Sequence, residues 1–141
     1  MSLIGPIISV EDDTDDQYLI SQIIQSFELP NKLIFFPNGK MALHYLETTK
    51  EKPFLILCDI NMPVMNGLEL REHINKNEFL RRKSIPFIFL STAANAQLIH
   101  IAYDAAVQGF YKKATSYSKF QQQLKLIIDY WQDCLHPNSQ L

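Results

Sequence analysis

Short apolar runs alternate along the chain with segments in which apolar residues recur every three or four positions. The runs cover residues 6–10, 33–36, 54–58, 86–90 and 109–111. Apolar runs of this length, bounded by polar or turn residues, are typical of strands that are buried on both faces of a sheet. We therefore expect five buried strands with helical segments between them.

Three of the intervening segments have the period of an amphipathic helix. Asp13, Asn38 and Ser116 precede helical segments and have side chains that commonly cap helix N-termini. Because buried strands that alternate with helices form parallel sheets with right-handed crossovers, the pattern predicts a doubly wound α/β fold. The expected helical faces are Leu19, Ile20, Ile23, Ile24 and Phe27; Leu98, Ile101, Ala102 and Ala105; and Phe120, Leu124, Ile127, Ile128 and Trp131.

Charged side chains follow three of the expected strands. In doubly wound sheets, ligands bind beyond the carboxyl ends of the strands, where the strand order reverses. The charged residues at these ends are therefore expected to form one site. They are Glu11 and Asp12 after the first run, Asp59 after the third, and Lys112 and Lys113 after the fifth.

Composition sets wider bounds on the protein. Its 141 residues suit one domain, and we expect a domain at 1–134 followed by a frayed C-terminal tail at 135–141. The net charge of −2, from 13 basic and 15 acidic residues, gives no reason to expect a nucleic-acid or anionic-membrane partner. Cys58 and Cys134 lack metal-ligand spacing and are expected to be reduced thiols.

No apolar run approaches the roughly 20 residues that span a bilayer. The segment from Met1 to Pro6 also lacks the pattern of a signal peptide. We therefore expect a cytoplasmic protein without a membrane partner.

The clustered acids predict metal chemistry. Carboxylates about 4 Å apart repel by about 4 kcal/mol at an effective dielectric constant near 20, so the site must protonate, pair with a cation or bind a metal. Mg²⁺ prefers oxygen ligands and commonly takes only one or two carboxylates, which leaves one carboxylate free to react. Transfer of a phosphoryl group to Asp59 would then give an aspartyl phosphate.

With these residues in place, the chain resembles the receiver domains of two-component response regulators, from Ile7 to about Trp131. Four motifs carry the resemblance: Val10-Glu11-Asp12-Asp13, Asp59-Ile-Asn61-Met-Pro63 with Gly67, Phe89-Leu-Ser91-Thr-Ala, and Phe110-Tyr-Lys112-Lys113. The resemblance implies a flavodoxin-like sheet with strand order 2-1-3-4-5 and five helices.

The resemblance also implies a role for each site residue. Asp59 is expected to be the phosphoacceptor, with Ser91 hydrogen bonding to the phosphoryl oxygen and Lys113 pairing with it. The metal ligands are expected to be Asp12 directly, Glu11 through a water molecule, Asp59, and the Asn61 backbone carbonyl. Asp15 and Asp16 are interpreted only as acids that favour the start of a helix.

Ala114, Glu11 and Ser91 depart from the family pattern, and Glu11 is longer than the usual acid by one methylene group. Ala114 stands where the family usually has proline after the lysine, so we expect no cis peptide bond there and a more loosely held lysine. Lys112 remains an alternative to Lys113, but strand alternation favours Lys113, because Lys112 shares a face with Phe110. Ser91 replaces the commoner threonine and supplies the same hydroxyl group.

The resulting interpretation is a stand-alone signalling receiver and not a turnover enzyme. Its phosphodonor would be a histidine kinase or phosphotransfer protein. Its output surface would be the fourth helix, fifth strand and fifth helix, with His100, Tyr103, Phe110 and Phe120. Two alternatives stay open: a Mg²⁺-dependent aspartyl-phosphate phosphohydrolase, although Asn61 cannot act as that class's second acid, and a docking receiver that is not phosphorylated.

Overall fold

One parallel sheet forms the centre of the protein, as the apolar runs predict. The structure is a computed structural model that describes residues 2–139. The strand order is β2-β1-β3-β4-β5, which confirms the expected flavodoxin-like arrangement. The strands are β1 (Ile7–Val10), β2 (Leu33–Phe36), β3 (Leu55–Cys58), β4 (Phe87–Ser91) and β5 (Gly109–Lys112).

Six α-helices, one more than expected, accompany the sheet in the described part of the chain. The extra helix arises at Asn77, whose extended backbone (φ −94°, ψ 108°) ends one helix while its side chain accepts a hydrogen bond from Leu80 N and starts the next. The helices are α1 (Thr14–Ser26), α2 (Gly39–Thr48), α3 (Gly67–Lys76), α4 (Glu78–Lys83), α5 (Ala96–Asp104) and α6 (Tyr117–Asp133), and a 3-10 turn spans Ser2–Ile4.

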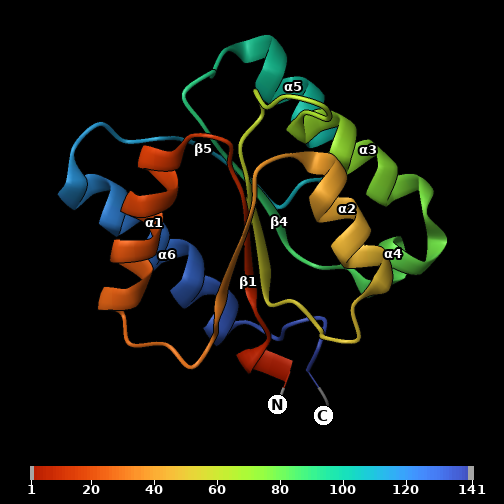
Figure 1. The fold of residues 1–141 in the computed structure, drawn as a ribbon, viewed down its shortest axis with the longest axis horizontal. Coiled ribbons are helices and arrows are strands. Elements are labelled where there is room, and N and C mark those ends of the chain that lie inside the picture. The colour runs from red at the N-terminus through yellow and green to blue at the C-terminus, as the bar shows by residue number, and fades with distance from the viewer. Residues whose placement is uncertain (1, 140–141) are drawn as a thin grey trace.

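The helices cover the sheet in two layers. Figure 1 shows α1 and α6 on one side of the sheet and α2, α3 and α4 on the other. Successive side chains of a strand point to opposite faces, so Ile7 packs with α1 and α6 while Ile8 packs in the opposite cluster with Ala42 of α2 and Ala102 of α5. Each helical layer therefore has its own apolar core.

Local signals place the helix starts. The side chains of Asp13, Asn38 and Ser116 each accept a backbone hydrogen bond at the N-terminus of α1, α2 and α6, which confirms the three expected caps. These caps satisfy N–H groups that have no partner within the helix. These three helices therefore start at the residues that the sequence predicts.

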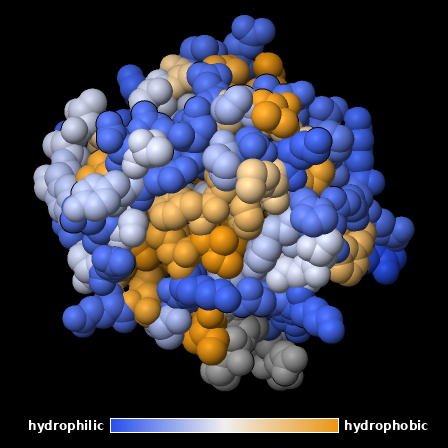
Figure 2. All heavy atoms as spheres, in the orientation of Figure 1, coloured by the Kyte–Doolittle hydropathy of each residue, from blue (hydrophilic) through white to orange (hydrophobic). Residues whose placement is uncertain are grey.

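Two expected buried faces are only partly buried. All four residues of β2 are half-buried because β2 is an edge strand, and Figure 2 shows an apolar band over it between polar helices. In α5, Ala102 is fully buried, whereas Ile101 is 44% exposed. This helix is therefore held by fewer core contacts than α1 or α6.

The segment after α6 packs against the domain instead of fraying. His136 is 3% exposed, its Nε2 lies 2.7 Å from Phe54 O, and its ring stacks on Phe54. Asn138 Nδ2 donates to Pro53 O. The prediction of a frayed tail at 135–141 is therefore wrong for His136 and Asn138, which pack against the domain. Residues 140 and 141 lie outside the described part.

No helix within residues 2–139 is long and apolar enough to cross a membrane.

Candidate functional site

The carboxyl ends of β1 and β3 bring the first two acids together. Val10 of β1 is the register partner of Cys58 of β3, so the next residue on each strand, Glu11 or Asp59, emerges at the same edge. Asp59 N continues the ladder by donating to Val10 O at 3.0 Å. The strand order reverses at β1, so these acids lie where doubly wound sheets bind ligands.

Asp12 completes a group of three carboxylates. Glu11, Asp12 and Asp59 each offer an oxygen atom, and these oxygens all lie within 4.8 Å of one another. Their exposure differs, because Glu11 is 2% exposed, Asp59 is half-buried and Asp12 is exposed. The group thus has a buried base and an open side toward solvent.

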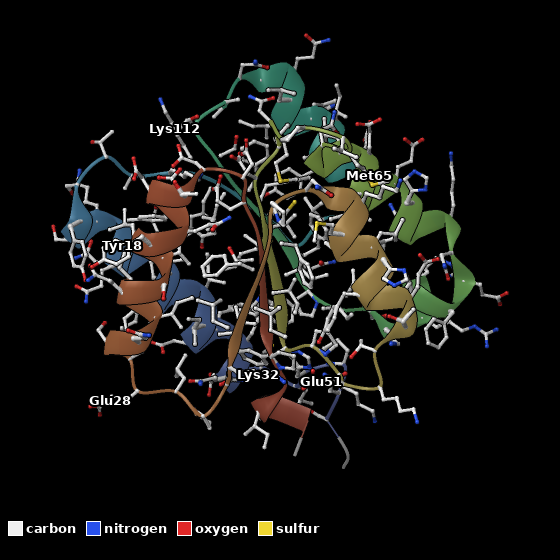
Figure 3. The ribbon with its side chains drawn as sticks, in the orientation of Figure 1. Tyr18, Glu28, Lys32, Glu51, Met65 and Lys112 are labelled. Atoms are coloured by element: carbon white, nitrogen blue, oxygen red, sulfur yellow. The ribbon has the colours of Figure 1, made fainter. Side chains whose placement is uncertain are left out.

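The ammonium group of Lys113 lies beside these acids. Lys113 N donates to Ser91 O at 3.0 Å, which continues the β4–β5 ladder by one residue. Its Nζ is hydrogen bonded to Glu11 Oε1 and lies 3.5 Å from Asp59 Oδ2. Lys112 is exposed, and Figure 3 shows its side chain pointing outward. The structure therefore brings Lys113, and not Lys112, to the acids.

Asp16 is a member of the site that the sequence interpretation missed. Its Oδ2 lies 2.8 Å from Lys113 Nζ, although the two residues are 97 positions apart. Its backbone N–H also donates to the Asp13 cap, as expected of an acid in the first helical turn. The spacing Asp13-x-x-Asp16 indicates only a helix start. The side chain of Asp16 pairs with Lys113, which follows β5 and is distant in the sequence.

Burial and charge oppose each other at this cluster. Burial raises the pKa of Glu11 to about 7, and its hydrogen bond with Lys113 offsets part of that effect. Burial alone would lower the pKa of Lys113, but hydrogen bonds to Asp16 and Glu11 and the nearby acids raise it above its usual value. Lys113 is therefore a permanent cation in this site.

Ser91 and Asn61 lie at the same end of the sheet as the acids. Ser91 is fully buried at the end of β4, and its Oγ accepts a hydrogen bond from Ala93 N at 3.1 Å. Asn61 is exposed in the loop after β3. Within residues 2–139, neither side chain hydrogen bonds to the three carboxylates. The roles expected for the Ser91 hydroxyl and the Asn61 backbone carbonyl remain predictions.

The loop between β3 and α3 holds Asp59 closely. Ile60 N donates to Asp59 Oδ1 at 2.7 Å, and Gly67 N donates to Ile60 O at 2.9 Å. A Cβ atom on Gly67 would lie 2.2 Å from Asp59 O, a separation that no side chain can occupy. Met65, labelled in Figure 3 at the same end of the sheet, accepts from Gly39 N at the start of α2. The loop is thus held by hydrogen bonds within itself and by one to the start of α2.

The donor set suits a hard divalent cation. Three carboxylates in reach of one another offer only oxygen, which is the ligand type that Mg²⁺ and Mn²⁺ prefer. The cluster also carries more negative charge than Lys113 can balance alone. The residues present therefore fit such an ion.

Comparison with known proteins agrees with this fold. The family model of the response regulator receiver domain matches residues 7–125. Response regulator Rcp1 of Synechocystis sp. is 27% identical over 130 residues, which cover 89% of this chain and 87% of that protein.

Two solved structures are similar over nearly the whole chain. The phosphorylated cyanobacterial phytochrome response regulator RcpA matches with a TM-score of 0.83 and 30% identity, covering 92% of this chain and 94% of its own. The Mn²⁺-bound form of Rcp1 matches with a TM-score of 0.80 and 25% identity, covering 93% and 96%. The chain therefore belongs to the family of response regulator receiver domains.

Proposed function

We propose that this receiver accepts a phosphoryl group on Asp59 from the phosphohistidine of a histidine kinase or phosphotransfer protein. A bond forms between phosphorus and an Asp59 carboxylate oxygen, while the bond between phosphorus and the histidine nitrogen breaks. The observation that carries the proposal is the grouping of Asp59 with two further acids and a buried lysine. The phosphorylated state of the similar protein RcpA supports it.

The proposed reaction depends on Mg²⁺. Asp12 and Asp59, Glu11 through a water molecule, and the backbone carbonyl of Asn61 would hold the ion. Bound there, the ion would neutralise charge on the acids and on the incoming phosphoryl group. The Mn²⁺-bound structure of Rcp1 supports a divalent ion in this family.

Lys113 and Ser91 would act on the phosphorylated state. The contact of Lys113 Nζ with Asp59 Oδ2 is long at 3.5 Å, so a phosphoryl oxygen on Asp59 would replace it at little cost while the bonds to Glu11 and Asp16 remain. Ser91 Oγ would exchange its hydrogen bond with Ala93 N for one to the phosphoryl group. Both side chains then interact more strongly with the phosphorylated protein, and this difference shifts the equilibrium between two conformations.

The output would be a change in protein contacts at the surface of α5, β5 and α6. A groove of about 970 Å³ lies there, and its lining includes Tyr103, Phe110 and Tyr130. Tyr103 is 51% exposed, and His100 is also exposed. Phe120, expected on this surface, is 1% exposed, because it points into the core between α1 and α6. The proposed surface therefore includes His100, Tyr103 and Phe110 but not Phe120.

Intact-mass spectrometry after incubation with acetyl phosphate tests the acceptor. We expect a phosphorylated species only with Mg²⁺ or Mn²⁺, because the acids need a cation before an anion can approach, and we expect none in Asp59→Asn. Lys113→Ala should slow phosphorylation. Lys112→Ala, on the preceding exposed lysine, is the matched control and should leave the rate unchanged. A phosphorylated Asp59→Asn protein would show that the acceptor is a different residue. A wild type that stays unmodified with metal would favour a docking receiver.

A further inference from the structure

The segment that carries Lys113 begins where the edge strand β5 ends. The Lys113 N–H pairs with Ser91 O on the inner side. Backbone groups alternate in direction along a strand, so the Lys112 carbonyl and the Ala114 N–H point to the outer side, where β5 has no neighbouring strand. An edge strand leaves such groups unpaired unless another element covers them.

The side chain of Gln123 pairs with both of these outer groups. Its Nε2 donates to Lys112 O at 2.8 Å, and its Oε1 accepts from Ala114 N at 3.1 Å. One amide group thus spans Lys113 and takes the place of a sixth strand for one residue pair. The backbone of Lys113 is thereby held from β4 on one side and from α6 on the other.

The helix that carries Gln123 is firmly anchored. Its neighbours Phe120 and Leu124 are 1% and 0% exposed in the core beneath α6. The amide therefore starts from a fixed position. No described peptide bond is cis, and a proline in place of Ala114 would lack the N–H that Gln123 Oε1 accepts from. The hydrogen bond between Ala114 N and Gln123 Oε1 therefore requires a residue other than proline at position 114.

We infer that Gln123 is a positioning residue for Lys113. The inference rests on the proposed phosphorylation of Asp59 and adds a residue that acts on it only through Lys113. By fixing the backbone on both sides of Lys113, the Gln123 amide determines where a long and flexible side chain begins. It thereby keeps Nζ in reach of Glu11 and Asp16 and, after transfer, of the phosphoryl group.

Gln123→Met tests this role, because methionine has a similar length but no amide. Gln122→Met is the matched control, since Gln122 is the preceding residue of α6 and is exposed. We expect Gln123→Met to slow phosphorylation of Asp59 by acetyl phosphate about three- to tenfold, as the loss of one or two hydrogen bonds implies. Gln122→Met should be phosphorylated at the wild-type rate.

A double-mutant cycle separates positioning from general structure. In a Lys113→Ala background, Gln123→Met should have no further effect on the rate, because the side chain that it positions is absent. A similar slowing in both backgrounds would overturn the inference.

The side-chain ammonium resonance of Lys113 in a ¹⁵N NMR spectrum provides a readout that does not require phosphorylation. We expect this resonance to be observable in wild type and Gln122→Met, and to shift or broaden in Gln123→Met. If the resonance is the same in all three proteins, Gln123 does not position Lys113. If the resonance changes as expected but wild-type Asp59 is not phosphorylated, the proposed function fails while the positioning role stands.

Discussion

Lys113 pairs with three acids at the site. Its ammonium contacts Glu11, Asp16 and Asp59, and exposed Asp12 lies beside two of these acids. One cation cannot balance four carboxylates, and removing it would leave neighbouring acids to repel one another. The same imbalance favours a divalent cation on the open side of the group, next to Asp12.

Asp12→Asn should separate metal binding from stability. Removing this charge relieves repulsion in the metal-free protein, so the melting temperature without metal should stay the same or rise. Mg²⁺ at about 100 times its Kd should stabilise the wild type by about 2.7 kcal/mol, and Asp12→Asn should lose most of that gain. Thermal unfolding with and without Mg²⁺ measures both effects.

Asp15→Asn is the matched control for this substitution, because Asp15 is an exposed acid in the first turn of α1. It should keep the Mg²⁺ effect. Undiminished stabilisation by Mg²⁺ in Asp12→Asn would move the ligand role to another acid, with Asp13 as the nearest candidate.

Ser91→Ala should separate phosphorylation from the response to it. One hydrogen bond to a charged group contributes about 1.5 to 3 kcal/mol, so the activated population should fall by about ten- to a hundredfold while Asp59 is still modified. NMR shifts of Phe110 and α5 with and without beryllofluoride measure the response. Thr92→Ala removes an exposed hydroxyl next to Ser91 and should respond as wild type does. A full response in Ser91→Ala would exclude the switching role.

At the scale of elements, the connection from β3 to α3 determines how Asp59 is presented. Asn66 forms a capping box with Glu69 at the start of α3, so the loop leaves the strand and enters the helix with its end groups paired. Gly67 then lets the helix start lie against the Asp59 carbonyl and the Phe89 ring. This close approach couples the geometry of the acceptor to the position of α3.

Gly67→Ala should therefore disturb both stability and the site. The new Cβ would meet Asp59 O at 2.2 Å and Phe89 Cε1 at 2.8 Å, and overpacking of this kind costs about 1 to 3 kcal/mol. Urea unfolding measures the free energy of unfolding, and intact-mass kinetics should show slower phosphorylation.

Gly109→Ala is the control, since its Cβ would meet no atom closer than 3.6 Å. It should leave stability equal or slightly higher. Equal stability of Gly67→Ala and wild type would mean that the loop can move away from Asp59 without cost.

At the scale of the whole molecule, the segment around His136, which follows α6, joins the layer formed by α1 and α6. His136 lies between Phe54 and Trp131, with ring centroids at 5.1 and 6.1 Å. Its Nε2 pairs with Phe54 O and its Nδ1 accepts from Asn138 N. This arrangement requires a neutral ring, because protonation of Nδ1 would remove the acceptor for Asn138 N.

The stability contributed by His136 should depend on pH. Burial lowers the pKa of His136 below its usual 6.5, so the unfolded chain takes up a proton at a higher pH than the folded one. The contribution is therefore complete above pH 6.5 and is lost as the pH falls through and below that value. Chemical unfolding between about pH 7.5 and 5.5 should show a smaller decline for His136→Gln than for wild type.

His44→Gln is the control, because His44 is exposed on α2. It should follow the wild-type pH profile, and Glu11 contributes equally in all three proteins. If His136→Gln declines as steeply as wild type, the docked C-terminal segment is not the pH-sensitive element.

The sequence by itself determined the strands, the caps at Asp13, Asn38 and Ser116, and the position of Asp59 at a strand end. These features depend on local physics: the period of apolar residues, the backbone hydrogen bonds of a helix start, and the break after a buried strand. The strand order and the family followed from the resemblance of four short motifs. The roles of Asp59, Ser91 and Lys113 remain predictions.

Only the tertiary structure decided which residues meet. Asp16 pairs with Lys113 across 97 positions. The Gln123 side chain of α6 hydrogen bonds to the backbone on both sides of Lys113. The break at Asn77 and the docking of His136 likewise depend on what each segment packs against. Such contacts join distant segments, and a local pattern of residue types contains no information on which distant partner the fold will supply.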